Sequence, residues 1–328
     1  MIRLFIILLF GAFLCQAQEQ EKLYIEMAQH SINSQNLPEA LVYLDSASIL
    51  SPADAKIPLM RAGIYTAQEE YRQAINSYDE AVKINPSLDN AYYERALLRN
   101  KVGDHREYSL RDIDQAISID PSNTEYLIQK ASFLSNRNNP QTGLPDHDEA
   151  IRILSQAIRM EPDSGRYINL RGKIKFESEQ PLAAIGDFSD AIYLDPENGE
   201  FYGDRGLTYL LIENYQSAIH DFTTAIRLDP LNHQYIQKRG HAKFNKGDYD
   251  QAVDDFTLAI NTIYRKVSLT SGRIDQNNPL NKALQENFLF RGSALLQVGA
   301  VYEACRDFKS ARNLGNRRAS NYVKRYCH

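Results

Sequence analysis

A motif that returns every 34 residues constrains the fold of this chain more than any other feature. Arg171, Arg205 and Arg239 are each followed by glycine and stand 34 residues apart. Aspartate-phenylalanine pairs at positions 187, 221 and 255 keep the same interval, as do alanines at 184, 218 and 252. A fixed period of this length predicts a stacked repeat architecture across residues 165–258.

Residues 199–230 serve as the type unit of this repeat. Tyr202, Gly206 and Tyr209 recur at spacings of three and four, which predicts one face of an amphipathic helix. A second such series begins at Ala218, and Pro230 ends it because the residue before a proline is pushed out of the helical region. Two helices of about 12 to 14 residues with a short turn form a helical hairpin. One hairpin buries too little apolar surface to fold alone, so neighbours must stack.

The spacing of these residues resembles the tetratricopeptide repeat (TPR) family. The matching positions are an aromatic residue, glycine, tyrosine, alanine, an aromatic residue, alanine and proline, here Tyr202, Gly206, Tyr209, Ala218, Phe222, Ala225 and Pro230. The resemblance implies an all-α, right-handed α-solenoid. It also implies that the first helices of the hairpins line a concave groove for peptide segments or partner helices.

The pattern divides the chain into about eight repeats followed by a capping helix. The predicted repeats span residues 21–54, 55–88, 89–123, 124–164, 165–198, 199–232, 233–267 and 285–315, with the cap at 316–328. Four departures interrupt the period. They are one extra residue near His105, a swollen turn at 136–148, a prolonged helix at 260–266, and an irregular connector at 268–280.

Residues 1–17 differ from the rest of the chain. Arg3 precedes an apolar run, Leu4–Leu14, and the small residue Ala17 stands before a candidate cleavage site at Gln18. This layout is typical of a secretory signal peptide, and the run is short for a membrane span. An uncleaved anchor and a lipid attached to Cys15 are the alternatives. We therefore expect an exported protein, periplasmic or at the cell surface or secreted, whose mature part, 18–328, has no further membrane span.

The charge balance narrows the partner classes. The chain carries 37 basic and 42 acidic residues, a net charge of −5, and loss of Arg3 with the leader changes this to 36 − 42 = −6. A mildly acidic chain argues against nucleic acid or an anionic membrane as the main partner. The pattern sets no oligomeric state.

An arginine and an aspartate recur together on the two helices of most repeats. Such a pair predicts a charge-assisted, bidentate bond between the helices of one hairpin rather than five copies of a catalytic pair. Repeats two and four break the pairing, with Arg61 against Ser77 and Lys130 against Ile153. The predicted pairs are Arg95–Asp112, Arg171–Asp187, Arg205–Asp221, Arg239–Asp255 and Arg291–Asp307.

Two cysteines follow the leader. Cys305 falls on the second helix of repeat eight and Cys327 at the end of the cap. In an exported protein they can form a disulfide that pins the cap, and two free thiols are the alternative. Two cysteines with only His328 nearby are too few for a zinc site.

No motif for catalysis or cofactor binding stands out, so the chain is predicted to be non-enzymatic and without a cofactor. There is no glycine-rich phosphate loop and no nucleophile elbow. Asp146, His147 and Asp148 in the swollen turn are potential metal ligands, but an aspartate at that place ordinarily caps the following helix.

By the resemblance, the candidate binding site is the groove formed by the first helices. Its mixture of apolar, amide and few charged residues suits protein or peptide segments. The alternative ligand is an envelope glycan, for which the aromatic rings of Tyr93, Phe176 and Phe244 would be the stacking surfaces. The groove residues on this register are Tyr93, Leu97, Asn100, Asn169, Lys173, Phe176, Gly203, Leu207, Leu210, Gln237, His241 and Phe244.

Overall fold

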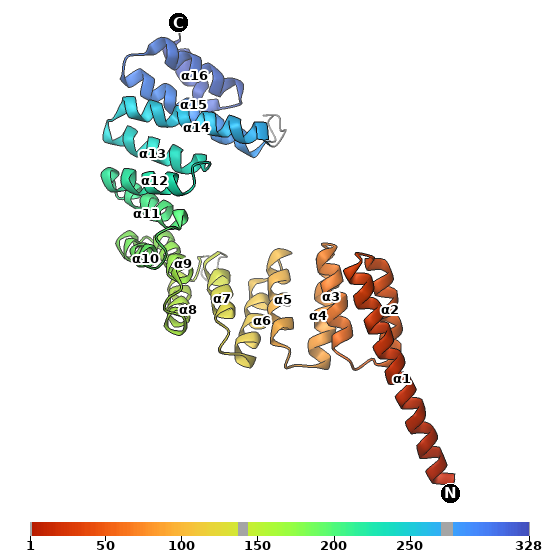
Figure 1. Ribbon diagram of the computed structural model, residues 1–328. Coiled ribbons are helices and arrows are strands. Elements are labelled where there is room, and N and C mark those ends of the chain that lie inside the picture. The colour runs from red at the N-terminus through yellow and green to blue at the C-terminus, as the bar shows by residue number, and fades with distance from the viewer. Residues whose placement is uncertain (1, 137–143, 270–277, 328) are drawn as a thin grey trace. The chain divides into compact units, whose positions relative to one another are not determined.

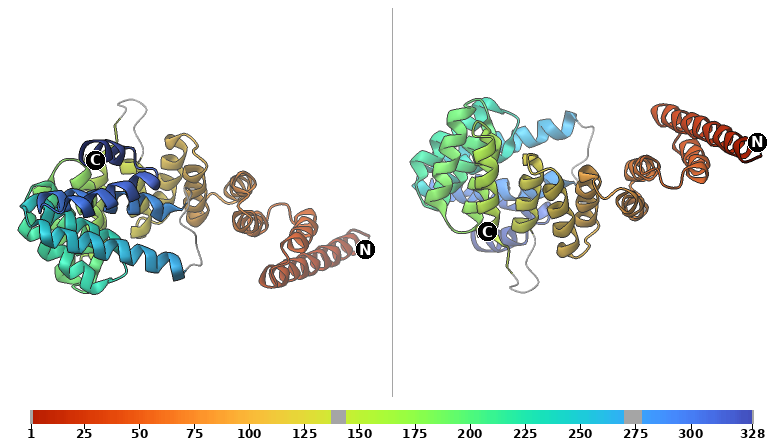
Figure 2. Two further views of the ribbon diagram at one scale, coloured as in Figure 1. Left: turned by 90° about the horizontal axis from the view of Figure 1, so that it is seen from above. Right: turned by 90° about the horizontal axis from the view of Figure 1, so that it is seen from below.

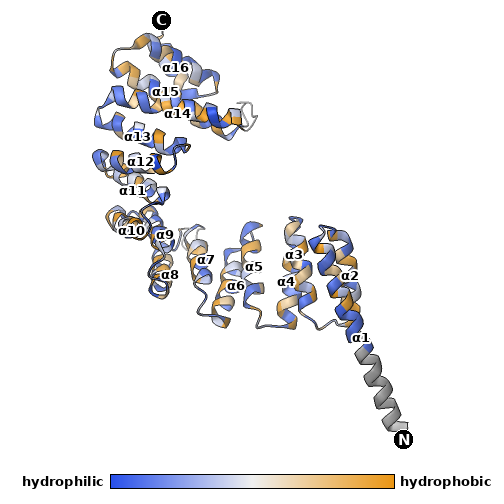
Figure 3. Cartoon of the chain, viewed as in Figure 1, coloured by the Kyte–Doolittle hydropathy of each residue, from blue (hydrophilic) through white to orange (hydrophobic). Residues whose placement is uncertain are grey.

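The computed structural model describes residues 2–136, 144–269 and 278–327, and these residues form helices and no strand (Figure 1). The chain divides into two compact units, Met1–Met160 and Glu161–His328. Most helices carry hydrophilic and hydrophobic residues in alternation (Figure 3), as helices that bury one face do. The all-α fold class predicted from the repeat is confirmed.

The first unit contains four antiparallel helix pairs. Consecutive helices pack against one another within each pair, and each pair packs on the next. The helices are α1 (Ile2–Asn33), α2 (Leu37–Leu50), α3 (Lys56–Ala67), α4 (Tyr71–Ile84), α5 (Asp89–Lys101), α6 (Arg106–Ile119), α7 (Thr124–Asn136) and α8 (His147–Met160).

The second unit contains four further pairs and a last single helix, seen from two more directions in Figure 2. Each first helix also contacts the first helix of the next pair, from α9 to α15. The helices are α9 (Gly165–Glu177), α10 (Pro181–Leu194), α11 (Gly199–Leu211), α12 (Tyr215–Leu228), α13 (His233–Lys246), α14 (Tyr249–Leu269), α15 (Pro279–Gln297), α16 (Val301–Asn313) and α17 (Arg317–Tyr326).

Glycine against phenylalanine sets the spacing of the two helices within a hairpin. Phe222 on α12 is 1% exposed and its ring lies against Gly206 on α11. A Cβ atom added to Gly206 would approach Phe222 Cε1 to 3.1 Å, and one added to Gly172 would approach Phe188 Cε1 to 2.7 Å. Both distances are tighter than ordinary packing allows, so the recurring glycine is required by the ring opposite it.

The turns inside the hairpins share a left-handed residue that the sequence analysis did not detect. Glu69, Glu179 and Glu213 have φ between 60° and 61°, and the equivalent place in other repeats is held by Gly103 and Gly247. Glutamate tolerates this conformation poorly, whereas glycine adopts it freely. The predicted extra residue near His105 appears as a four-residue turn between α5 and α6.

The departures from the period lie largely where they were predicted, with one correction. Helix α14 continues to Leu269, so the prolonged helix is confirmed and is longer than expected. The connector predicted at 268–280 is wrong at both ends, because Ser268 and Leu269 are helical and α15 already begins at Pro279. The Asn278 side chain accepts a bond from the Leu280 N–H at 2.9 Å, which starts the helix early. Residues 270–277 and 137–143, the middle of the predicted swollen turn, lie outside the described residues.

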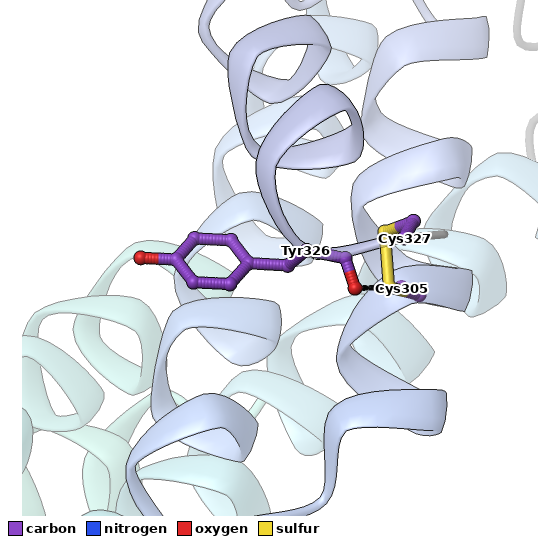
Figure 4. The surroundings of a disulfide bond; sticks show 3 residues. All are labelled: Cys305, Tyr326 and Cys327. Atoms are coloured by element: carbon purple, nitrogen blue, oxygen red, sulfur yellow. Dashed lines mark hydrogen bonds between the residues drawn. A yellow bond between two sulfur atoms is a disulfide. The ribbon is translucent and has the colours of Figure 1, made fainter.

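A disulfide and a ring stack hold the final helix against α16. The Sγ atoms of Cys305 and Cys327 are bonded, and the Cα atoms are 5.5 Å apart (Figure 4). Tyr322 stacks on Phe308 with ring centroids 4.7 Å apart, and Ala319 is fully buried. Helix α17 therefore closes the apolar end of the last repeat, as a solenoid cap does.

Candidate functional site

The five predicted arginine–aspartate pairs are all in contact, and each is bidentate. In every pair Nε donates to one carboxylate oxygen and Nη2 to the other, at 2.6 to 2.9 Å. The aspartate side chains are between 2% and 7% exposed. Buried carboxylates that are fully bonded to a neighbouring helix hold structure together and have no free oxygen face for a substrate.

Two of these arginines also bond to the preceding repeat. Arg205 Nη1 donates to Ser189 Oγ at 3.1 Å, and Arg239 Nη1 donates to Thr223 Oγ1 at 3.2 Å. In each case the acceptor lies 16 residues earlier, on the second helix of the preceding repeat. Each arginine thus fixes the hairpin and its neighbour together.

Several of these aspartates bind a second cation that the sequence analysis missed. Lys243 Nζ lies 2.8 Å from Asp255 Oδ2, and Lys175 Nζ lies 2.8 Å from Asp187 Oδ2. Each lysine stands four residues after the paired arginine, so the helical spacing was the available signal. In repeat two, where Ser77 replaces the aspartate, Arg61 turns to Asp45 instead, at 3.0 Å.

In the first unit, the groove residues predicted on α5 lie beside the core. The ring of Tyr93 is 5.0 Å from that of Tyr126, and Leu97 packs against the core of this region. Asn100 lies in the last turn of α5 and is half-buried. These residues are largely occupied by contacts within the chain.

In the second unit, the predicted groove residues of α9 bond to α11. Asn169 Nδ2 donates to Asp204 Oδ2 at 3.0 Å. Lys173 pairs with Glu200 and with Asp204, the latter at 3.3 Å. Burial raises the pKa of Asp204 above its ordinary value, although Lys173 opposes that change. Here the first helices are joined by polar contacts.

Further along, α13 and α15 are joined in the same way. Gln237 Nε2 donates to Glu286 Oε2 at 3.3 Å. His241 meets the ring of Phe290 edge-on with centroids 4.1 Å apart. Burial lowers the pKa of His241 to about 4, with Lys238 adding to the effect, so the imidazole is neutral at pH 7. Phe244 makes a ring contact with Tyr249 at 5.3 Å.

A cavity of about 750 Å³ opens at the C-terminal end of this row of first helices. Two predicted groove residues, Leu210 and His241, line it, whereas Leu207 and Gln237 do not. The residues that sequence reasoning missed come from α13, α15 and the start of α17, and include the basic side chains of Lys238, Lys282, Arg317 and Arg318. We call the surface formed by α9, α11, α13 and α15 the first-helix face, and this hollow the terminal cavity.

Within the ranges that the structure describes, no cluster of three His, Cys, Asp or Glu side chains has the arrangement of a metal site. Asp146, considered above as a cap or a ligand, precedes α8 and forms an ion pair with Arg106 at 2.7 Å. No helix among those described combines the length and apolar character needed to cross a bilayer.

The hairpins, the period and the glycine–phenylalanine contacts define an α-solenoid of helical repeats. Family models match residues 63–103 as a TPR repeat and residues 199–230 and 233–262 as tetratricopeptide repeats. The chain therefore contains tetratricopeptide repeats.

Curated relatives match parts of the chain. Hsp70-Hsp90 organizing protein 3 of Arabidopsis thaliana is 23% identical over 155 residues, which covers 44% of this chain and 26% of that protein. Tetratricopeptide repeat protein 13 of Homo sapiens is 30% identical over 122 residues, covering 36% and 13%. The chain therefore spans about a quarter or less of the length of these relatives.

A solved structure supports the fold over a larger share of the chain. The C-terminal part of a TPR repeat-containing protein from Cytophaga hutchinsonii aligns with a TM-score of 0.61 and 14% identity, covering 79% of this chain and 97% of that one. Identity at this level shows the shared fold alone. Together with the repeat match, this alignment supports the α-solenoid fold of the chain.

Proposed function

We propose that the chain is a non-enzymatic scaffold that holds a segment of another protein on its first-helix face. The observation that carries this proposal is the terminal cavity. It is large enough for several side chains of a bound segment and is lined by Leu210, His241, Leu289 and Phe290 together with polar groups. Apolar surface with a few polar groups is the composition that binds protein segments.

The first-helix face is held in place before any partner arrives. The bonds from Gln237 to Glu286 and from Asn169 to Asp204 fix neighbouring first helices, and His241 is clamped against Phe290. A receptor that is already ordered loses little conformational entropy on binding, which favours affinity.

The lining of the terminal cavity does not favour catalysis. Its imidazole, His241, has a pKa of about 4 and is buried against rings, while the carboxylate of Glu286 accepts a bond from Gln237. An acid–base pair needs groups that exchange protons near the working pH within reach of a substrate. The geometry supports binding rather than turnover.

The aromatic residues named for a glycan do not favour that ligand. Tyr93 and Phe244 make their ring contacts with Tyr126 and Tyr249 of the same chain. A sugar-stacking surface requires exposed ring faces, so we propose protein as the ligand class.

We further propose that the chain is exported. The leader-like residues 1–17 support this proposal, as does the bond between Cys305 and Cys327, since disulfides persist in oxidising compartments. In α1 the buried contacts lie at Ile25 and Ala28, while residues 18–20 are exposed, so a cut before Gln18 removes none of those contacts. N-terminal sequencing of the protein from its own cells should begin at Gln18, and an uncut N-terminus would contradict cleavage.

The binding proposal is tested by site-specific photo-crosslinking in cells. A photoreactive amino acid replaces Leu210 in the terminal cavity, and in a matched variant it replaces Tyr193, which is 87% exposed on α10. We expect another protein to be captured through position 210 and not through 193. Equal capture at both positions, or capture of this chain alone, would overturn the proposal.

A further inference from the structure

The terminal cavity differs from the rest of the first-helix face in its charge. Four cationic side chains line it, Lys238, Lys282, Arg317 and Arg318, with the single lining carboxylate of Glu286. With His241 neutral, the formal charge of the lining is 4 − 1 = +3, in a chain whose net charge is −5. A concentration of one sign of charge in a hollow attracts the opposite charge.

These four cations lack ion-pair partners among the residues that the structure describes. On the same first helices, Lys173 pairs with Glu200 and Asp204, and Lys243 pairs with Asp255. Contacts within the fold therefore account for these two lysines. They do not account for the four cations of the terminal cavity.

Three of the four positive charges come from parts of the chain outside the repeats, and the fourth, Lys238, lies on α13. Lys282 lies in the early extension of α15, before the eighth repeat begins at 285, and Arg317 and Arg318 belong to the cap. The turn between α16 and the cap is bonded to α15, because Gln285 Nε2 donates to the Leu314 carbonyl at 2.8 Å. The extension and the cap together thus build a hollow that a regular repeat does not have.

The apolar and the charged residues that line the cavity differ in exposure. Leu289 is buried and Leu210 and Phe290 are partly buried, whereas Lys282 and the arginines in the first turn of α17 are exposed. A ligand that fits must present an apolar side chain to the buried residues and a carboxylate to the exposed cations. A long polyanion such as a nucleic acid needs an extended basic track, and the acidic balance of the chain does not supply one.

We propose that the terminal cavity binds an acidic protein segment in which carboxylates flank apolar side chains. This inference rests on the proposed function and specifies the chemistry of the bound segment. Because four cations line the cavity and a chain end supplies only one carboxylate, the carboxylates are those of Asp or Glu side chains in the segment.

The test measures binding of labelled peptides to the full chain by fluorescence anisotropy. One peptide alternates glutamate with leucine, a second replaces glutamate by glutamine, and each is made with a free and with an amidated C-terminus. We expect the glutamate peptide to bind about tenfold or more tightly than the glutamine peptide, with the difference falling as salt is added. Equal affinity of the two peptides would overturn the inference. The amidated forms show whether side chains or the chain end supply the charge.

Paired variants on one helix separate this site from general electrostatics. The double variant R317Q/R318Q should weaken binding of the glutamate peptide about tenfold, whereas K324Q/R325Q at the other end of α17 removes the same charge and should leave it unchanged. An equal loss in both variants would refute the site. Thermal unfolding of both, without peptide, checks that the cap remains folded.

Two further outcomes keep this inference distinct from the proposed function. If photo-crosslinks at Leu210 capture a partner but the glutamate peptide binds no better than the glutamine peptide, the acidic preference fails and the scaffold stands. If a DNA oligonucleotide displaces the glutamate peptide at a lower concentration than the unlabelled peptide does, the cavity is a polyanion site and the inference fails.

Discussion

Replacing Asp255 by serine tests whether the recurring charge pair holds the repeats together. Asp255 is 4% exposed as a side chain, and it receives bonds from Arg239 at 2.7 and 2.9 Å and an ion pair from Lys243 at 2.8 Å. Asp254 is exposed on the same helix and makes none of these contacts, so D254S is a matched control for helix propensity and charge.

The magnitude follows from what the substitution leaves behind. Each hydrogen bond to a charged group contributes about 1.5 to 3 kcal/mol, and removing one partner of a buried pair costs about 3 to 5 kcal/mol. The Arg239 side chain keeps 15% of its surface exposed and retains its bond to Thr223 at 3.2 Å. Because water and Thr223 recover part of the loss, we expect D255S to destabilise by about 4 kcal/mol and D254S by less than about 0.5 kcal/mol.

A rescue by charge relocation sharpens the test. Arg95 of repeat three donates from Nη1 to Asp79 of repeat two, 16 residues earlier, at 2.6 Å. The equivalent acceptor for Arg239 of repeat seven is Thr223 of repeat six, which is exposed, so T223D offers Arg239 a replacement carboxylate. The double variant T223D/D255S should recover about 1 kcal/mol, the upper range for a partly exposed ion pair.

The assay must resolve single helices, because repeat arrays need not unfold in one step. Amide hydrogen exchange measured on α13 and α14 of the full chain gives the free energy of local opening. Urea unfolding gives the stability of the whole array. If the amides of α13 and α14 are equally protected from exchange in D255S and in D254S, the arginine–aspartate pair does not stabilise the hairpin. If T223D gives the same gain when Arg239 is replaced by glutamine, the rescue is not due to Arg239.

For three further substitutions, the structure predicts whether stability rises or falls. C327S opens a loop of 22 residues, so we expect a loss of about 3 kcal/mol confined to the last repeat and cap in hydrogen exchange, and no further effect of a reductant on the variant. E213G relieves a left-handed glutamate at φ 61° and should stabilise by about 1 kcal/mol in urea unfolding, whereas Q216G inside α12 should cost about the same. The pKa of His241 is lowered from 6.5 to about 4, so the unfolded state binds more protons than the folded state between these pH values. The free energy of unfolding should therefore fall by about 3 kcal/mol from pH 6.5 to pH 4. H241F should remove this pH dependence in urea unfolding measured over a series of pH values.

The hairpins could be predicted from the sequence because the residues that determine them are close together in the chain and recur. Glycine opposite phenylalanine, proline after the second helix and the arginine–aspartate pair each appear several times, so the period exposes them. The cap was also predictable, and α17 spans Arg317–Tyr326 because Asn316 caps it and a glycine precedes that cap. Comparing the repeats with one another thus shows which positions are required by packing.

The start of α15 was not predictable from the period. Asparagine and proline are common in turns, which favours a connector here, yet Asn278 caps the helix and Pro279 occupies its first turn, where a missing N–H costs nothing. The same two residue types mark a turn or a helix start, and only the packing of Leu280 and Leu284 against the end of α14 decides between them.

The terminal cavity was missed because its parts are far apart in sequence and each has an ordinary local explanation. Lys282 alone is a surface lysine, and the arginines of the cap satisfy its need for a polar outer face. Their convergence depends on where α17 is fixed, through Gln285 and Leu314. Tertiary placement of this kind leaves no periodic signal.

The regular part of the first-helix face and the terminal cavity differ in whether their cations have ion-pair partners. In the regular repeats, first-helix cations such as Lys173 and Lys243 are neutralised by carboxylates on neighbouring helices, as a stable array requires. In the terminal cavity, four like charges lie together without ion-pair partners among the described residues, and like charges repel one another. Residues kept at some expense in stability are characteristic of binding sites. The terminal cavity, where the sequence departs from the repeat, is therefore the part of the first-helix face best suited to bind a partner.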